Sequence, residues 1–255
     1  ALLLAGCFGV LSAEARETRV QVHNACIPVL TDRPFHVVAE ICIENRGAEP
    51  VVFDGASVAL RNGPASGVVR SLRLVYTGTM SALWSRTTSG AMKDQFKRLG
   101  GSQTIYCDPG YALPQPEIRP SATGTVWLPA GLRLPIGRHY FYVSAAVGPT
   151  AANALSDAFE LAVTRVGIDG FDTAFMQDRN LPRRIGVGVR RHGDDGVYAY
   201  RIPGLVTTNA GTLLGVYDVR RCTRNDLQDD IDVGLSRSTD GGRTWEPMRI
   251  IMDMG

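Results

Sequence analysis

Three side chains toward the C-terminal end of the sequence have types and a spacing that could do chemistry. Arg201 is followed by Arg220 after nineteen residues, and Asp226 lies six residues further on. A guanidinium group is permanently charged and can hold a carboxylate through two parallel hydrogen bonds, whereas an aspartate can donate and then accept a proton. Among the 27 basic residues only Lys93 and Lys97 are lysines, so a single arginine is weak evidence. The hypothesis rests on the combination.

Other carboxylates compete with Asp226 for the role of proton donor. They are Asp229, Asp230 and Asp232. Asp232 falls inside a predicted strand that begins at Ile231, and the two residues before that strand can simply be solvated. The spacing from Arg220 therefore favours Asp226.

A short turn pattern of the form S-x-D-x-G-x-T-W follows these side chains. Its fixed positions are Ser238, Asp240, Gly242, Thr244 and Trp245. Asp240 can accept hydrogen bonds from the backbone amides of the turn, and the glycines permit positive φ angles. Trp245 can pack onto the sheet. The pattern is similar to the Asp-box (BNR repeat) of β-propellers, where its role is structural.

The order of these pieces resembles the opening blade of bacterial exo-α-sialidases, or neuraminidases. Tyr200-Arg201-Ile202-Pro203 resembles their YRIP motif, and the second arginine, the aspartate and the Asp-box follow in the order of that family. The stretches 185–190, 193–196 and 204–208 look like the surroundings of this motif in sialidases of gut and oral Bacteroidetes. In that group an N-terminal β-sandwich, taken to be a carbohydrate-binding module, precedes the propeller.

The resemblance implies a hydrolase that removes terminal α-linked sialic acids from glycoconjugates with retention. Arg201 and Arg220 would belong to the cluster that binds the sugar carboxylate, and Asp226 would serve as acid and base. Sialidases use a tyrosine nucleophile, since a carboxylate would be repelled by the substrate's own charge. The resemblance implies that this tyrosine and its partner glutamate lie beyond Gly255, in a longer enzyme of which this chain is the N-terminal portion. It implies no metal and no cofactor.

Two other functions remain open at this stage. The first is a propeller with an accessory sandwich that binds sialic acid or another glycan without cleaving it. A general acid at Asp226 argues against this, because a lectin does not need one. The second is a related enzyme that gives an anhydro or transglycosylated product. The sequence predicts no oligomeric state.

The elements expected to position the site are β-strands. Four are predicted within residues 185–255, at Arg201–Thr207, Thr212–Val219, Ile231–Ser238 and Trp245–Ile251. A four-stranded meander is typical of one propeller blade. The resemblance implies a six-bladed propeller, of which residues 185–255 would be the first blade, incomplete because blades bury their faces against one another.

The preceding region is expected to be a β-sandwich. Residues 16–165 contain short β-patterned runs between Gly and Pro turns and no long helical periodicity. Examples of these runs are Phe35–Glu44, Pro50–Phe53, Val68–Tyr76 and His139–Ser144. Ser89–Leu99 is a weak candidate for a short helix. Residues 166–184, with two glycines, a proline and several charges, predict a connector. The expected class is all-β.

The overall charge excludes some partners. A formal net charge of +2 argues for neither nucleic acid nor an anionic membrane. Five arginines cluster around the expected connector, with aspartates among them: Arg179, Arg183, Arg184, Arg190 and Arg191. Such charge runs usually face water, so we expect a solvated surface.

The first fifteen residues indicate export. Residues 1–15 are apolar and end in the small-residue pattern Ala13-Glu14-Ala15, as in the remnant of a signal peptide. A lipid anchor at Cys7 is the less favoured alternative. Periplasmic, surface and secreted locations all remain open, and no later stretch is long and apolar enough to span a bilayer. The other cysteines are Cys26, Cys42, Cys107 and Cys222. They are expected to be buried thiols or to form one bridge such as Cys26–Cys42, with Cys222 either lining the pocket mouth or packing.

Overall fold

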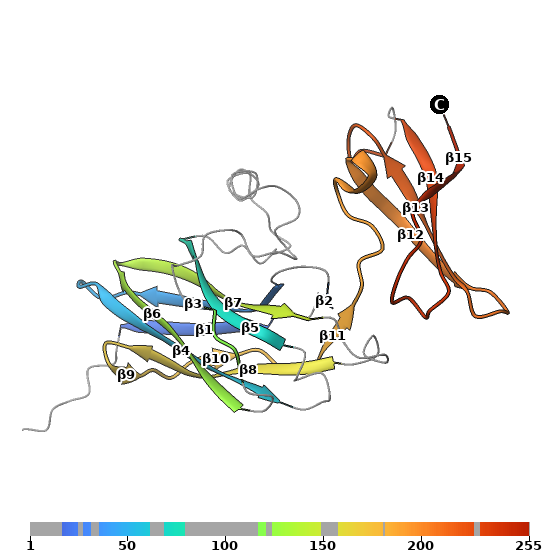
Figure 1. Cartoon of the computed structure of the whole chain (residues 1–255). Coiled ribbons are helices and arrows are strands. Elements are labelled where there is room, and N and C mark those ends of the chain that lie inside the picture. Colours follow the sequence, from blue (N-terminus) through green and yellow to red (C-terminus); the bar gives the residue numbers. More distant parts are fainter. Residues whose placement is uncertain are drawn as a thin grey trace, which may run out of the picture.

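The structure is a computed structural model of the chain. It describes residues 17–24, 28–31, 36–61, 69–79, 117–120, 124–148, 158–180, 182–226 and 230–254. Within these ranges the chain forms three β-sheets, two that face each other and one further along the chain (Figure 1). The regular structure there is strand, apart from one 3₁₀ turn at Asp194–Gly196. The expected all-β class, with a sandwich followed by a four-stranded sheet, is confirmed.

One sheet of the sandwich has five strands in the order β10-β1-β3-β7-β5. Their bounds are Thr18–Asn24 (β1), His36–Asn45 (β3), Val69–Gly78 (β5), Gly137–Val147 (β7) and Met176–Gln177 (β10). Neighbouring strands are antiparallel except β1 and β10, which pair in parallel. The central strand β3 is buried along nearly its whole length.

The facing sheet has the order β2-β11-β8-β4-β6, and β9 pairs with β8. Its bounds are Val29–Leu30 (β2), Val51–Arg61 (β4), Gly124–Leu134 (β6), Ala158–Ile168 (β8), Phe171–Asp172 (β9) and Arg183–Gly186 (β11). Short connections join β3 to β4 (residues 46–50, with Gly47 and Pro50) and β6 to β7 (Pro135 and Ile136), in keeping with the Gly and Pro turns expected there. Strand β4 extends well beyond the run Pro50–Phe53 that is visible in the sequence.

The core of the sandwich lies between these two sheets. Phe53 on β4 and Phe141 on β7 are both fully buried, and their ring centroids are 4.5 Å apart across the interface. Tyr76 on β5 packs on the same Phe141 ring at 4.9 Å. Large aromatic rings dominate the burial energy of a core. This contact therefore fixes the two sheets face to face.

The structure corrects the expectation of a connector over residues 166–184. Strand β8 continues to Ile168, β9 folds back onto it, and β10 pairs with β1 through Gln21 and Met176. Strand β11 then pairs with both β8 and β2. The sandwich thus extends to Gly186. Edge strands of two to four residues are too short to carry a periodic sequence signal, which is why the pattern failed here.

Arg183 corrects the expectation of a solvated arginine run. Its side chain is almost fully buried and donates from Nε and Nη2 to the Val38 carbonyl, at 3.1 and 2.6 Å. It also donates to the Leu161 carbonyl at 3.3 Å and to the side chains of Asn24 and Asn180 at 3.2 Å. A buried guanidinium is tolerated only when its donors are satisfied. Arg183 therefore connects both sheets of the sandwich.

The third sheet is a four-stranded antiparallel meander in the order β12-β13-β14-β15. Its bounds are Ala199–Thr207 (β12), Leu213–Arg220 (β13), Ile231–Ser238 (β14) and Arg249–Met252 (β15). Three strands match the prediction within two residues. The fourth begins at Arg249 instead of Trp245, because residues 245–248 complete the turn before it.

One face of this meander is covered by the segment that precedes it. Tyr217 and Val219 on β13 are buried together with Val197. Tyr200 stands edge-on to Tyr217, with ring centroids 5.2 Å apart. Side chains alternate between faces along a strand, so the residues between these positions lie on the opposite face. That opposite face carries the candidate site.

Several sequence expectations concern residues outside the described ranges. These are the segment 1–15, Cys7, Cys26, Cys107 and the helix candidate at 89–99. Cys42 is described as a buried free thiol, so the suggested Cys26–Cys42 bridge is not formed. Burial raises the pKa of this thiol, although a hydrogen bond with Tyr140 opposes the shift. Across the described residues, no helix has the length and apolarity to cross a membrane.

Candidate active site

The strand register brings Arg201 and Arg220 to one face of the four-stranded sheet. Arg201 on β12 lies directly opposite Asp218 on β13, and Arg220 follows two residues later on the same strand. Residues i and i+2 of a strand point to the same side, and directly paired residues share a face. The side chains of Arg201, Asp218 and Arg220 therefore lie close together on one face, although nineteen residues separate Arg201 from Arg220 in the sequence.

Asp226 completes this group from the loop after β13. Its Oδ1 lies 2.8 Å from Nη1 of Arg201 and 2.9 Å from Nη2 of Arg220. The exposed fraction of the side chain is 69% for Asp226, 40% for Arg201 and only 2% for Arg220. One carboxylate oxygen is thus shared by two guanidinium groups, one accessible and one buried. The sequence predicted these three residues as a group, and the structure brings them together.

The loop that carries Asp226 is held to the two arginines by its backbone as well. Arg201 and Arg220 both donate from Nη1 to the Arg224 carbonyl, at 2.7 and 3.1 Å. Arg220 Nη1 also donates to the Asn225 carbonyl. Charge-assisted hydrogen bonds are roughly twice as strong as neutral ones. The short loop is therefore folded around the arginine pair.

Asp218 is a site residue that the sequence interpretation missed. Its Oδ2 accepts a hydrogen bond from Arg220 Nη2 at 2.7 Å, and its side chain is 24% exposed. Burial alone would lower the pKa of Arg220, but hydrogen bonds to Asp218 and Asp226 outweigh it and raise that pKa. The signal that could have found Asp218 is its i−2 spacing from an arginine on a predicted strand.

Backbone strain lies next to Arg201. The pairing of β12 with β13 shifts between Arg201 and Gly204, as in a β-bulge, and Ile202 has a φ of 49°. Positive φ is unfavourable for a β-branched residue. Bulges redirect side chains and are frequent beside active sites. The bulge places Ile202 in an exposed position and sets the course of the strand at Arg201.

The competing carboxylates lie elsewhere. Asp232 is the strand partner of Val219, so it is buried on the covered face of the sheet, away from Arg201 and Arg220. It forms an ion pair with Arg221 at 2.7 Å. Asp230 faces the same Arg221 at 3.5 Å. Asp229 lies outside the described residues. Cys222 is exposed, so the structure does not support a packing role for it.

The segment before β12 is tied to the sheet by Arg190. Its Nη2 donates to the Glu246 carbonyl at 2.9 Å, and its Nε forms an ion pair with Asp195 at 3.1 Å. Tyr200 donates its hydroxyl to the Asp194 carbonyl at 2.9 Å. Burial and the neighbouring Asp195 raise the pKa of Tyr200, which keeps this phenol neutral. These contacts fix the start of β12, which carries Arg201.

The turn at Ser238–Trp245 is organised around Asp240. Its carboxylate accepts hydrogen bonds from the Thr244 hydroxyl at 2.6 Å, from the Ser238 hydroxyl at 2.8 Å, and from the amides of Arg243 and Thr244 at 3.0 Å. These bonds, that of the Thr244 hydroxyl first, lower the pKa of Asp240.

The two glycines and the tryptophan complete this turn. Gly241 and Gly242 have φ angles of 76° and 89°, which favour glycine. The Gly242 amide donates to the Ser238 hydroxyl at 2.9 Å, and Trp245 Nε1 donates to the Gly242 carbonyl at 3.1 Å.

This turn lies at the end of the sheet remote from the arginines. Arg220 pairs with Ile231 at one end of β14, and Leu213 pairs with Ser238 at the other. Seven residues of strand separate these ends by roughly 20 Å. The turn therefore stabilises the sheet without contributing to the candidate site.

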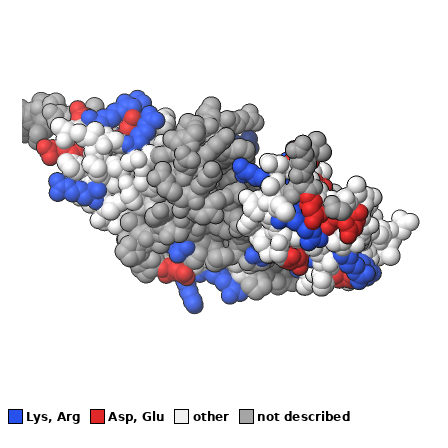
Figure 2. Space-filling model, turned by 90° about the horizontal axis from the view of Figure 1, so that it is seen from above, with Lys and Arg blue, Asp and Glu red and all other residues white. Residues whose placement is uncertain are grey.

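The charges around the site are mixed. At the site itself two arginines lie against Asp218 and Asp226. Elsewhere, the face seen in Figure 2 carries both basic and acidic side chains among the described residues. Among the described residues no group of His, Cys, Asp and Glu side chains could hold a metal ion. The arrangement offers two arginines that can hydrogen-bond an anion and one aspartate that can transfer a proton.

Comparison with known proteins supports a relationship to sialidases. The chain is 34% identical over 242 residues to a sialidase of Bacteroides fragilis (strain YCH46), covering 94% of this chain and 42% of that protein. It is 30% identical over 88 residues to a sialidase of Paraclostridium sordellii, covering 34% of this chain and 21% of that protein. It is 35% identical over 66 residues to an anhydrosialidase of Macrobdella decora, covering 23% of this chain and 9% of that protein. No family model matches.

A solved structure gives the same result. The Hadza microbial sialidase Hz136 superimposes with a TM-score of 0.72 at 33% identity, covering 91% of this chain and 44% of that one. The chain is therefore a homologue of sialidases over nearly its whole length, and it shares their fold. It spans less than half the length of the Bacteroides fragilis protein and of the solved structure.

Proposed function

We propose that the protein is an exo-α-sialidase that hydrolyses terminal α-linked sialic acids from glycoconjugates with retention. The observation that carries the proposal is the contact of Asp226 with Arg201 and Arg220, at 2.8 and 2.9 Å, in a homologue of sialidases. A cation pair beside a carboxylic acid suits a glycoside whose sugar carries its own carboxylate.

Arg201 is the better placed of the two arginines to bind the substrate carboxylate. It is substantially exposed, whereas Arg220 is buried and already bonded to Asp218 and to the loop carbonyls. Arg220 would supply charge at short range and hold the loop. In the structure both guanidinium groups are occupied by Asp226, so an incoming carboxylate must displace Asp226 from them. This displacement would leave Asp226 available for proton transfer.

Asp226 would then act as the acid and base of the reaction. It would protonate the glycosidic oxygen as the bond to the anomeric carbon breaks, and later remove a proton from water. Its exposure and its position on a loop permit both steps, because each needs access to a bound sugar and to solvent. The flanking arginines would stabilise the anionic substrate throughout.

Retention requires a nucleophile, which in sialidases is a tyrosine. Tyr200 and Tyr217 do not suit this role, because they lie on the covered face of the sheet and bond to Asp194 and Ser236 respectively. A phenol whose pKa is raised, as in Tyr200, is also a poorer nucleophile. The proposal therefore needs a nucleophile other than these two tyrosines of the four-stranded sheet.

Export of the protein and glycan binding by the sandwich belong to the same proposal. Export is supported by the apolar segment 1–15, and sialylated glycoconjugates are usually extracellular. A sandwich that binds sugar would keep such an enzyme on its substrate through local concentration. These parts stand on the sequence pattern and on analogy with the group that the sequence resembles.

The test is an assay of the full-length gene product on an aryl sialoside and on sialyllactose. Asp226→Ala should lose about 10²- to 10⁴-fold on sialyllactose, whose leaving group needs protonation, and much less on the aryl sialoside. Asp230→Ala is the matched control and should keep its rate. Equal losses on both substrates would contradict the acid/base role of Asp226.

Product analysis by NMR distinguishes the remaining alternatives. An initial α-anomer of free sialic acid supports retention, and an initial β-anomer contradicts it. An anhydro sugar as the main product would replace hydrolysis by the reaction named for the Macrobdella decora relative. Binding of sialosides without turnover by the full-length protein would make it a lectin.

A further inference from the structure

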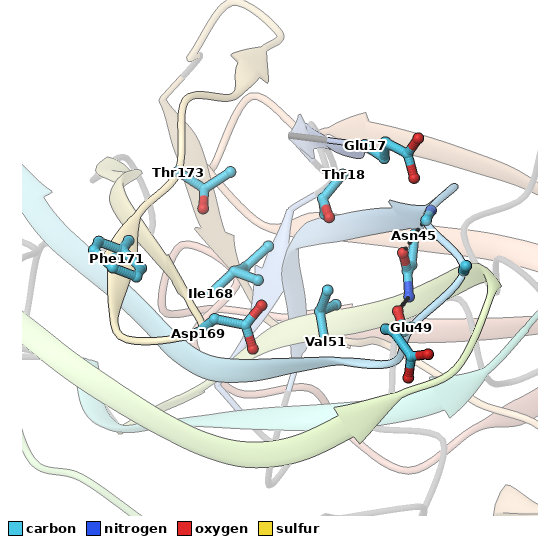
Figure 3. A pocket seen from close by; sticks show the side chains of 11 residues that line it. Glu17, Thr18, Asn45, Glu49, Val51, Ile168, Asp169, Phe171 and Thr173 are labelled. Carbon is cyan, nitrogen blue, oxygen red and sulfur yellow. Dashed lines mark hydrogen bonds between the residues drawn. The ribbon is translucent and has the colours of Figure 1, made fainter. Parts of the chain in front are cut away.

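The sandwich contains a pocket that is separate from the arginine site. It has a volume of about 690 Å³ and lies at one end of the sandwich, where the start of β1, the β3–β4 hairpin and the β8–β9 turn meet (Figure 3). None of the strands that line it belongs to the four-stranded sheet. Pockets of several hundred Å³ with a few convergent polar groups are the usual form of small-ligand sites.

Carboxylates lie on two opposite sides of this pocket. Figure 3 shows Glu17 and Glu49 on one side and Asp169 on the other. None of the residues lining the pocket is a lysine, an arginine or a histidine. Within the described part of the chain, the side chains of Glu17 and Glu49 form no hydrogen bond or ion pair. The pocket therefore presents negative charge from both sides that its own lining does not compensate, and this favours a cation.

The β3–β4 hairpin leaves room for the carboxylate of Glu17. A Cβ atom at position 47 would lie only 3.0 Å from Oε2 of Glu17, so the glycine found there allows the carboxylate to lie over the hairpin. The backbone carbonyl of Glu17 accepts a hydrogen bond from the Arg46 amide at 2.8 Å. This carboxylate is thus supported by a fixed backbone.

The β8–β9 turn holds the carboxylate on the other side. Asp169 and Gly170 have φ angles of 52° and 75°, and two central residues with positive φ are typical of a type I′ hairpin turn. Oδ1 of Asp169 accepts a hydrogen bond from the Val52 amide at 2.7 Å, and the Asp169 amide donates to the Val52 carbonyl at 2.9 Å. The turn is therefore fixed before any ligand binds, which lowers the entropy lost on binding.

A buried hydroxyl group is a second, independent sign of a ligand. The side chain of Thr173 is 9% exposed, and its Oγ1 has no hydrogen-bond partner among the described residues. The Thr173 amide donates to the Val166 carbonyl at 2.8 Å, which fixes the position of the residue. Figure 3 shows this side chain on the pocket wall with the hydroxyl turned toward the interior. A buried polar atom without a partner is costly, so a ligand that donates to it gains free energy.

The space between the two acidic sides is apolar. Val51 and Ile168 line it, and Phe171 stands at its edge with 60% of its surface exposed. Methylene groups gain free energy when they leave water for such a surface. An ammonium group near the face of an aromatic ring is also attracted by that ring. The lining thus suits a ligand that has a cation at each end and an apolar chain between them.

We propose that this pocket binds a linear alkyl diamine or polyamine. One ammonium group would lie between Glu17 and Glu49, and the other would donate to Thr173 and Asp169. An ammonium group has three donors and no acceptor, which matches a lining of acceptors. A metal ion suits the pocket less well, because no group of acidic side chains in the described ranges is arranged to hold one. The pocket shares no residue with the arginine site, so this proposal does not depend on the function proposed above.

Titration of the whole chain with 1,5-diaminopentane at low ionic strength, followed by NMR, tests the proposal. The diamine should bind with a Kd of about 0.1–1 mM and shift the signals of pocket residues. n-Pentylamine has one ammonium group and should bind about tenfold more weakly. 1,5-Pentanediol, which has the same chain length and no charge, should show no saturable binding. Raising the ionic strength to about 0.15 M should weaken diamine binding several-fold.

Substitutions in the lining should weaken this binding. Glu17→Gln and Glu49→Gln each keep hydrogen-bond acceptors and remove one charge, so each should weaken diamine binding about three- to tenfold. Thr173→Val replaces the hydroxyl by a methyl group of similar size and should weaken it about threefold or more. Glu160→Gln, near the opposite end of β8, and Thr207→Val, at an exposed position of β12, are the matched controls and should bind normally.

The same titration includes results that would overturn the proposal. Binding of 1,5-pentanediol as tight as that of the diamine would make the pocket a site for an uncharged ligand. Saturable Ca²⁺ binding that displaces the diamine would make it a metal site. N-acetyl-lysine methylamide bound more tightly than the diamine would indicate a lysine of a partner protein. Each of these results would contradict the proposal, as would the absence of localised shifts with the diamine.

Discussion

Arg220 donates a hydrogen bond from Nη2 to Asp218 at 2.7 Å, and the same Nη2 lies 2.9 Å from Asp226. One buried guanidinium thus links a strand carboxylate to a loop carboxylate. Asp218 is fixed by its place in β13, whereas Asp226 is exposed on a loop. The position of Asp226, the proposed acid, is therefore set by Arg220, whose side chain is buried.

Replacing Asp218 should disturb both stability and catalysis. Asp218→Ala leaves Arg220 with one carboxylate partner fewer in a buried position, and the loss of a charged hydrogen bond costs about 1–3 kcal/mol. Asp218→Asn keeps the shape and one acceptor and should cost less. Urea unfolding of the chain measures the stability, and sialoside turnover by the full-length protein measures the activity.

The informative readout for Asp218 is the pH dependence of kcat/KM. If Asp218 positions Arg220 and through it Asp226, then Asp218→Asn should move the limb of the profile that reports the acid. A purely structural role would lower activity uniformly and leave the profile unchanged, so an unshifted profile contradicts the positioning role.

Lysine substitutions should distinguish the two arginines. Lysine at position 220 cannot make the four contacts that Arg220 makes with Asp218, Asp226 and the carbonyls of residues 224 and 225. Arg220→Lys should therefore lower kcat, by about 10²-fold, because the loop is no longer held. Arg201→Lys retains a charge at an exposed position and should mainly raise KM. If both variants changed kcat and KM in the same proportions, the two arginines would not have the different roles proposed for them.

Asp240 should make the stability of the four-stranded sheet depend on pH. Its native pKa is lowered by hydrogen bonds, so the ionised form is favoured in the folded state. The stabilisation is present above the unfolded pKa of about 3.9 and is lost as pH falls through the native value. Asp240→Asn should lower the melting temperature at pH 7, and the gap from the native chain should close below about pH 4.

Activity separates the turn from the site. The turn lies at the far end of β14 from Asp226, so Asp240→Asn should leave KM of the full-length enzyme unchanged at temperatures where it is folded. A raised KM in Asp240→Asn would show that the turn communicates with the substrate site.

The sequence predicted three strands of the four-stranded sheet to within two residues, because short β-forming runs between turns are a local signal. It also predicted that Arg201, Arg220 and Asp226 belong together, since a motif order fixes which strands carry them. It did not identify Asp218, because the partner of a buried arginine depends on strand register and not on spacing alone.

Non-local contacts account for the remaining failures. Strands β9, β10 and β11 exist only through pairing with distant strands such as β1 and β8, so residues 166–184 showed no pattern of their own. The pocket in the sandwich is likewise assembled from three distant segments. Composition around Arg183 suggested solvent, whereas its partners are carbonyls far along the chain.

Mutation of Arg183 tests whether this side chain is buried and bonded, as in the structure, or solvated, as the composition suggested. Arg183→Ala should destabilise the sandwich by about 2–4 kcal/mol, since it removes the hydrogen bonds that Arg183 donates to the buried carbonyls of Val38 and Leu161. Its neighbour Arg184 is exposed, so Arg184→Ala is the matched control and should change the free energy of unfolding by less than about 0.5 kcal/mol. Urea titration of both variants, followed by circular dichroism, measures the difference. Equal stability of the two variants would contradict the role of Arg183 in connecting the two sheets.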